Sequence, residues 1–252
     1  MGNRIYGEKV TIAADDMQTF WCKRAATFAE KGSSAVILGD QNAERANQEN
    51  EFDREHIVPQ LGLTRNSRVI DMGCGVGRLT KMLLPKCGHY CGVDYSEEML
   101  QITNQVCAQL QSADSQAGTY SLHHLSFLEA VEKGPEYFGG CFDTFVMMSI
   151  CMYINDAELE QAFQLVPRLM NGQAVILLQE SMGLGQRLTL DRVASDALQT
   201  SYSAIYRTKE EYFKLYEPLF QAGFTFVEEA QMPNFGNSYP DSERRFCIMK
   251  RG

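Results

Sequence analysis

The sequence predicts an α/β fold built on a mostly parallel sheet. From residue 68 onward, short apolar runs alternate with segments of helical period, as strands and helices do around a parallel sheet. A glycine-rich turn separates the first apolar run from the helix that follows it. The chain has 252 residues, of which 44% are hydrophobic, so it can bury one substantial core. We therefore expect one α/β domain with additions.

The predicted strands are short apolar runs bounded by turn residues. They cover residues 68–72, 90–94, 121–125, 143–148, 173–179, 225–230 and 245–250. The predicted helices cover residues 77–84, 97–111, 156–169 and 209–222. Gly223 follows the last helix in the position of a C-cap. Strands and helices therefore alternate through this part of the chain.

Two segments lie outside this alternation. Residues 1–60 form an N-terminal unit whose part from 15 to 60 is mostly helical, broken by a loop-like stretch at 31–42. Residues 181–208 form a long insertion after the fifth strand, and long insertions in compact folds are often lids or binding loops. We expect the arm and the insertion to cover the substrate side of a site in the remaining domain, residues 61–252.

The composition disfavours several classes of partner. A formal net charge of −9 opposes binding to long nucleic acid, which depends on Lys and Arg. The longest apolar runs are far shorter than the ~20 residues that a membrane helix needs. The N-terminus lacks a secretory signal pattern, and the eight cysteines include no C-x-x-C pair. We expect a cytoplasmic protein with no membrane partner and no long nucleic acid partner.

An acid followed by three spaced glycines is the strongest functional signal. Asp71 ends an apolar strand, and Gly73, Gly75 and Gly77 follow it before a helix. Such glycines let the backbone turn tightly and approach a ligand closely. Nicotinamide enzymes use G-x-G-x-x-G, whereas this pattern is D-x-G-x-G-x-G. Asp94 ends the next strand, where its carboxylate can accept two hydrogen bonds from a ribose diol.

At these residues the sequence resembles the class I methyltransferase family. The resemblance covers residues 68–180 and continues more weakly to the C-terminus. It implies a Rossmann-like, seven-stranded, mostly parallel sheet with helices on both faces, extended by the N-terminal arm and by the insertion after strand 5. It implies S-adenosyl-L-methionine as the cofactor. The cofactor-binding residues that it implies are Asp71, Gly73, Cys74, Gly75, Gly77, Arg78, Asp94, Tyr95, Ser96, Met99, Ser126, Phe127, Leu128, Met148, Ser149 and Tyr153.

Some of these positions have a competing structural interpretation. Arg78 follows the last glycine, as in the similar stretch of protein N-terminal methyltransferases, and is expected to pair with the methionine carboxylate or to lie on a solvated helix face. Tyr95 and Met99 are expected to pack on the ribose and adenine or to fill the core. The family usually has Asp where Ser126 stands, beside the adenine.

Three side chains are candidates for orienting or deprotonating a methyl acceptor. They are Glu180 at the end of the fifth strand, Tyr206 in the insertion and His123 in the third strand. Each has a structural alternative: a helix or lid contact for Glu180, an apolar helix face for Tyr206 and ordinary polar packing for His123. No metal site is predicted, because the acid of a catechol-type divalent-metal site is missing after the fourth strand.

The predicted function is methyl transfer from S-adenosylmethionine to a small polar acceptor. The acceptor is expected to be a sugar, an amine or a biosynthetic intermediate, methylated on oxygen or nitrogen. The sequence after the fourth strand, residues 149–152, lacks the Asn/Asp-Pro-Pro-aromatic signature of enzymes that methylate bases. Two alternatives stay open: modification of a peptide or protein N-terminus, and a cofactor-binding sensor or subunit without transferase activity. The oligomeric state is not predicted.

Overall fold

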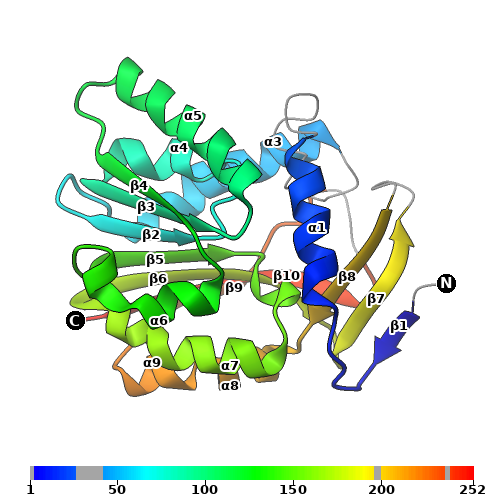
Figure 1. Cartoon of the computed structure of the whole chain (residues 1–252). Helices are drawn as coiled ribbons and strands as arrows, with labels where there is room; N and C mark the ends of the chain where they lie inside the picture. Colours follow the sequence, from blue (N-terminus) through cyan, green and yellow to red (C-terminus); the bar gives the residue numbers. More distant parts are fainter. Residues whose placement is uncertain (1–2, 27–41, 196–199, 236–238) are drawn as a thin grey trace.

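A seven-stranded sheet forms the centre of the molecule in the computed structural model, which describes residues 3–26, 42–195, 200–235 and 239–252 (Figure 1). The strand order is β4-β3-β2-β5-β6-β10-β9, and β10 alone runs against the others. This confirms the predicted α/β, mostly parallel fold. The strands are β2 (Arg68–Met72), β3 (His89–Asp94), β4 (Thr119–His124), β5 (Phe142–Met148), β6 (Met170–Gly183), β9 (Thr225–Gln231) and β10 (Ser242–Arg251).

Helices cover both faces of the sheet (Figure 1). Helices α4 (Thr80–Leu83) and α5 (Glu97–Ala113) lie on one face, with helix α3 (Ala43–Phe52) and the turns that follow it, Asp53–Ile57 and Val58–Leu61. The opposite face carries α6 (Phe127–Tyr137), α7 (Asp156–Leu165), α8 (Lys209–Leu215) and α9 (Glu217–Gln221). Side chains alternate along β2, so Val69 packs into the core on the α4–α5 face of the sheet and Ile70 into the core on the opposite face.

Several helices differ from their predicted bounds. The helix predicted at 77–84 begins only at Thr80, because residues 75–79 are needed for the glycine turn. The stretch 209–222 is two helices, and Pro218 stands in the first turn of the second, where its missing N–H costs no helical hydrogen bond. Helix α6 was not predicted. Its start carries a capping box between Ser126 and Glu129, but Gly134 and Pro135 interrupt its helical period.

The additions form a second, smaller sheet beside the main one (Figure 1). The insertion is an antiparallel pair, β7 (Leu188–Ser195) and β8 (Thr200–Tyr206), so the helical alternative for Tyr206 is wrong. Strand β1 (Asn3–Tyr6) pairs with β7. The prediction of a helical N-terminal arm did not include this strand. Helix α1 (Ala14–Ala25) packs against α5 and β8. Most of the loop predicted at 31–42 lies outside the described residues.

Within the described ranges, no helix is both long enough and apolar enough to cross a lipid bilayer. The longest helix, α5, has 17 residues and carries polar side chains along one side. The main sheet, its two helical layers and the β1-β7-β8 sheet together set the boundaries of the candidate site.

Candidate active site

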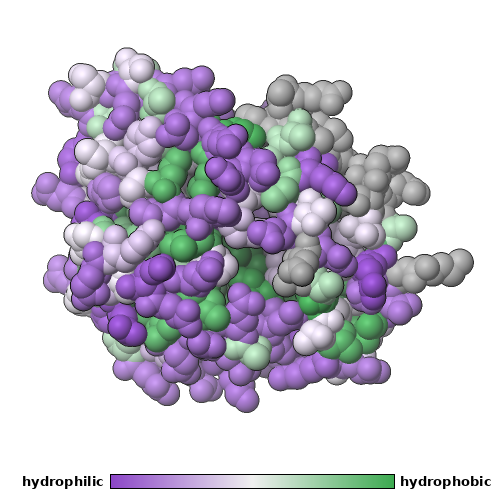
Figure 2. Space-filling view, viewed as in Figure 1, coloured by the Kyte–Doolittle hydropathy of each residue, from purple (hydrophilic) through white to green (hydrophobic). Residues whose placement is uncertain are grey.

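A cavity of about 790 Å³ opens at the carboxyl edge of the parallel strands. This is the edge where ligands bind in open α/β sheets, and the volume is in the range of small-molecule sites. The ends of β2 to β6, helix α1 and strand β8 all contribute to its walls. Figure 2 shows apolar side chains in the hollow at the centre of this face, with hydrophilic side chains around it.

The glycine turn after β2 forms one wall of the cavity. Gly73, Gly75 and Gly77 all have left-handed φ values, of 74°, 56° and 78°, which glycine adopts without steric cost. The backbone N–H of Gly73 donates to Val93 O over 2.8 Å. A Cβ at Gly73 would lie 2.2 Å from Cδ1 of Ile150, so the loop after β5 packs directly on the turn. The glycine spacing therefore allows close approach both to a ligand and to that loop.

Asp94 lies at the cavity wall at the end of β3. Its carboxylate accepts hydrogen bonds from the N–H of Gly75 and of Ser96, both over 2.9 Å. Burial raises the pKa of Asp94 to about 6. A carboxylate offers about four acceptor positions, so two remain after these bonds. The arrangement fits the binding of two vicinal ribose hydroxyls.

Asp71 has a structural partner under the turn. Its carboxylate accepts a hydrogen bond of 2.8 Å from the hydroxyl of Tyr90, which is itself hydrogen-bonded to Thr80 over 2.7 Å. Burial raises the pKa of Asp71 to about 6. Asp71 also lines the cavity, so its side chain connects the buried hydrogen bonds of Tyr90 and Thr80 to the cavity wall.

Arg78 connects the glycine turn to the N-terminal arm. Its Nη1 lies 2.5 Å from Oδ2 of Asp53 and 3.2 Å from Oδ1 of Asn50. Its Nη2 lies 3.9 Å from Sδ of Met148 at the end of β5. The side chain lines the cavity, so the interpretation as a solvated helix-face charge is wrong. Anchored in this way, the guanidinium keeps further N–H donors for a carboxylate.

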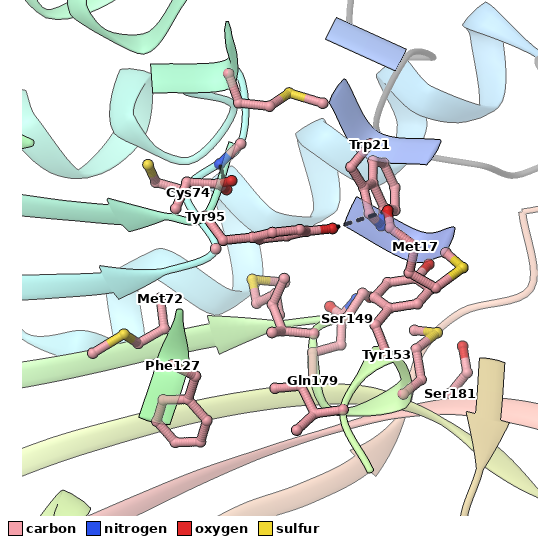
Figure 3. Close-up of a pocket in the computed structure, with 18 of the residues that line it drawn as sticks. Met17, Trp21, Met72, Cys74, Tyr95, Phe127, Ser149, Tyr153, Gln179 and Ser181 are labelled. Carbon is pink, nitrogen blue, oxygen red and sulfur yellow. Dashed lines mark hydrogen bonds between the residues drawn. The ribbon is translucent and has the colours of Figure 1, made fainter. Parts of the chain in front are cut away.

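Helix α1 covers the part of the cavity next to Tyr95. The hydroxyl of Tyr95 donates to the backbone oxygen of Met17 over 3.1 Å, drawn as the dashed line in Figure 3. Trp21, one turn further along α1, lines the same space. Met99 and Phe127 also line the cavity. The arm therefore supplies side chains to the site as well as covering it.

A chain of three phenols, Tyr153, Tyr202 and Tyr206, lines the cavity next to α1. The hydroxyls of Tyr153 and Tyr202 are 3.0 Å apart, and Tyr206 of the same strand as Tyr202 lines the cavity with them. Burial raises the pKa of all three hydroxyls, so they are neutral at pH 7. The ring of Tyr153 meets that of Trp21 edge to face, with centroids 5.4 Å apart. This side of the cavity is therefore aromatic, with hydroxyls that can bind a ligand.

The loop after β5, residues 149–154, is held in place by two buried side chains, Glu180 and Arg207. Oε1 of Glu180 accepts hydrogen bonds from the N–H of Ile150 and of Cys151, over 3.0 and 2.8 Å. Arg207 donates to the oxygens of Cys151 and Ile154, over 2.8 and 2.7 Å. Burial raises the pKa of Glu180 to about 7. The two side chains hold a loop whose first residue, Ser149, has a left-handed φ of 61°.

The structure brings most of the predicted cofactor residues to the cavity. Three others lie outside it. Gly77 faces Thr103 of α5, Ser96 is the buried N-cap of α5, and Leu128 packs on the core beneath α6. Each of these three residues directly follows a residue that lines the cavity. They support the glycine turn and the helices from behind the cavity wall.

The predicted catalytic residues separate in the same way. Tyr206 lines the cavity. Glu180 does not, because β6 continues to Gly183 and alternation sends Gln179 and Ser181 to the cavity instead. His123 is also absent from the cavity wall. Its ring packs between Tyr137 and Phe138, at 5.3 and 5.1 Å, so the polar packing alternative describes its position.

Several residues at the cavity were not predicted. They come from segments remote in sequence from the glycine motif and are Arg4, Met17, Gln18, Arg45, Glu49, Tyr239, Ser242 and Arg244. Arg244 binds Glu49 through both terminal nitrogens, over 2.6 and 2.5 Å. No spacing in the sequence joins residues 195 positions apart. In the described part of the chain, no three His, Cys, Asp or Glu side chains are grouped as a metal site.

Comparison with known proteins agrees with this geometry. Residues 69–172 match the family model described as methyltransferase domain. Phosphoethanolamine N-methyltransferase 1 of Caenorhabditis elegans is 22% identical over 172 residues, which are 68% of this chain and 32% of that protein. The chain thus spans about a third of the length of this relative.

Solved structures share the whole fold. A magnesium protoporphyrin IX methyltransferase from Synechocystis, with bound S-adenosylhomocysteine, has a TM-score of 0.63 at 16% identity, over 95% of this chain and 99% of that one. Phosphoethanolamine N-methyltransferase 1 of Haemonchus contortus has a TM-score of 0.66 at 18% identity, over 94% and 48%. The fold and the glycine turn are those of proteins that bind S-adenosylmethionine. Residues 69–172 therefore carry a methyltransferase domain, and the chain has the fold of class I, S-adenosylmethionine-dependent methyltransferases.

Proposed function

We propose that the chain transfers the methyl group of S-adenosylmethionine to a small polar acceptor bound beneath α1 and β8. The observation that carries this proposal is that one cavity of about 790 Å³ has both the glycine turn with Asp94 and the phenol chain in its walls. Two ligands in one cavity can be aligned for direct transfer. Phosphoethanolamine and magnesium protoporphyrin IX, named for the relatives, are small molecules, which supports an acceptor of this class.

The cofactor half of the site has a role for each lining group. Asp94 is proposed to bind the ribose diol, and the turn from Gly73 to Gly75 to pass beneath the methionine part. Arg78 is proposed to pair with the methionine carboxylate. Tyr95, Met99 and Phe127 would enclose the adenine. When bound, S-adenosylmethionine supplies a methyl group on a positively charged sulfur.

The acceptor half works by positioning. Methyl transfer is an in-line displacement, so holding the acceptor atom on the line of the breaking bond can supply much of the acceleration. Residues 149–154 form the wall next to the reacting atoms and are fixed by Glu180 and Arg207. The phenols of Tyr153, Tyr202 and Tyr206 orient the acceptor by hydrogen bonds. We assign Glu180 a positioning role, since it lies behind this wall.

Transfer of labelled methyl groups tests the proposal. The protein would be incubated with labelled S-adenosylmethionine and with separate pools of small metabolites and short peptides, with Asp94→Ala as the matched control. We expect label in a small-molecule pool with wild type and little with the variant. Label in peptides alone would support N-terminal peptide methylation instead. Cofactor binding without transfer to any pool would support a sensor or subunit.

A further inference from the structure

The acceptor end of the cavity presents hydrogen-bond donors. Two arginines act on the phenol chain: the positive charge of Arg244 opposes the burial that raises the pKa of Tyr153, and Arg4 does the same at Tyr206. Both arginines line the cavity. Arg244 uses two of its five N–H donors in hydrogen bonds to Glu49, so its other donors can bind a ligand. Since Arg244 is fixed by this ion pair, its remaining donors are held in place.

The phenols add to this donor set. Tyr153, Tyr202 and Tyr206 carry three hydroxyl protons, and the hydrogen bond between Tyr153 and Tyr202 uses one of them. Two protons remain, and although Met152 Sδ lies 3.7 Å from the Tyr202 hydroxyl, they can be donated to a stronger acceptor in the cavity. An anionic oxygen is such an acceptor.

The same end offers no proton acceptor suited to an alcohol among the described residues. Glu49 is the acid that lines it, and although burial raises the pKa of Glu49, Arg244 and its neighbours lower it on balance. The other lining acids lie at the glycine turn or at the start of α6 and α7. His124 also lines the cavity but is hydrogen-bonded to Tyr95 O on the adenosine side. An acceptor that is already ionised needs no base.

We propose that the methyl-accepting atom is an anionic oxygen, of a carboxylate or a phosphate on a small molecule, bound by Arg244, Arg4 and the phenol chain. This inference rests on the proposed function and names its acceptor class. The acceptor oxygen forms a bond to the methyl carbon while the carbon–sulfur bond breaks and its electron pair stays on sulfur. One negative and one positive charge disappear, and no proton moves. The product is a methyl ester of the acid.

Four acceptor pools separate this class from its rivals. Labelled S-adenosylmethionine would be offered with small carboxylic acids, phosphomonoesters, primary amines or sugar alcohols. We expect label in the first or second pool. Mild alkali releases methanol from a carboxyl methyl ester and leaves a methyl phosphate intact, which distinguishes the two sources. The acceptor kcat/KM should stay level between pH 7 and 9, because both anions are already ionised.

Other outcomes of the same experiment overturn the inference. Label only in amines or alcohols, with a rate that rises with pH, leaves the proposed function standing and contradicts the anionic acceptor. No label in any pool, with cofactor binding intact, contradicts the proposed function and with it this inference.

A pair of variants tests the role of Arg244. Arg244→Gln removes the cation but leaves Glu49 unpaired, whereas Glu49→Gln/Arg244→Gln removes both charges. We expect acceptor affinity, measured by calorimetry on the S-adenosylhomocysteine complex, to fall about tenfold or more in both proteins, with cofactor affinity unchanged. Wild-type acceptor affinity in the double variant would mean that Arg244 serves only Glu49. Arg4→Gln, whose partner Asp241 lies near the surface, gives a second test with less risk to folding.

Discussion

The backbone N–H of Gly75 donates to the carboxylate of Asp94 over 2.9 Å, which joins the glycine turn of β2 to the acid at the end of β3. The two elements of the sequence motif are therefore parts of one structure. Since both line the same cavity, a change in Asp94 is expected to act on the cofactor both directly and through the turn.

Asp94→Ala should weaken binding of S-adenosylmethionine by ~1–3 kcal/mol, because both ribose hydroxyls lose their acceptor. Asp94→Asn keeps one acceptor oxygen and should lose less. Calorimetric titration of the three proteins measures the difference. Equal affinity in all three would mean that the ribose lies elsewhere.

Cofactor binding should weaken as the pH falls below about 6. Burial raises the pKa of Asp94 to about 6, so the free protein takes up a proton there that the ribose contact disfavours. The Kd should then rise by up to about tenfold for each further pH unit. Asp94→Asn is the matched control: it retains Asp71, and its Kd should change much less. The same pH dependence in both proteins would assign the effect to another group.

Glu180→Gln should change how stability depends on pH. The pKa of Glu180 is raised by burial from its ordinary value to about 7, so its stabilising contribution is complete below pH 4.5 and is lost as the pH rises through 7. Relative to the variant, wild type should lose unfolding free energy between pH 5 and 8, on the order of 1–3 kcal/mol. Chemical denaturation at both pH values measures this. Parallel curves for the two proteins would contradict the assignment.

Tyr206→Phe should reduce turnover or acceptor affinity several-fold and leave cofactor affinity nearly intact. Loss of one hydrogen bond to the acceptor costs roughly 0.5–1.5 kcal/mol. Tyr137→Phe is the matched control, because Tyr137 lies on the exposed side of α6, away from the cavity. If Tyr206 only packs, the melting temperature would change and the kinetics of the two variants would agree.

The sequence predicted those parts of the site that are local in the chain. The glycine turn and Asp94 depend on residues within one strand-turn-helix-strand unit, where spacing fixes the geometry. The register of β6 was not predictable from its apolar run, and it decides that Ser181, not Glu180, faces the cavity.

The cover of the site depends on long-range contacts that no local pattern encodes. Tyr95 meets Met17 across 78 positions, and Glu49 meets Arg244 across 195. Strand β1, near the N-terminus, pairs with β7 of the insertion, which lies far from it in the sequence. The sequence predicted that the arm and the insertion would cover the site but could not predict which of their side chains enter it.

Calorimetric titration with S-adenosylmethionine, S-adenosylhomocysteine and NAD tests the central claim most directly. Three glycines in D-x-G-x-G-x-G spacing, with Asp94 bound to the turn, predict that the first two ligands bind at one site and that NAD does not. Heats of binding for both adenosyl ligands and none for NAD would agree with a methyltransferase. Tight binding of NAD, with no response to S-adenosylmethionine, would contradict it.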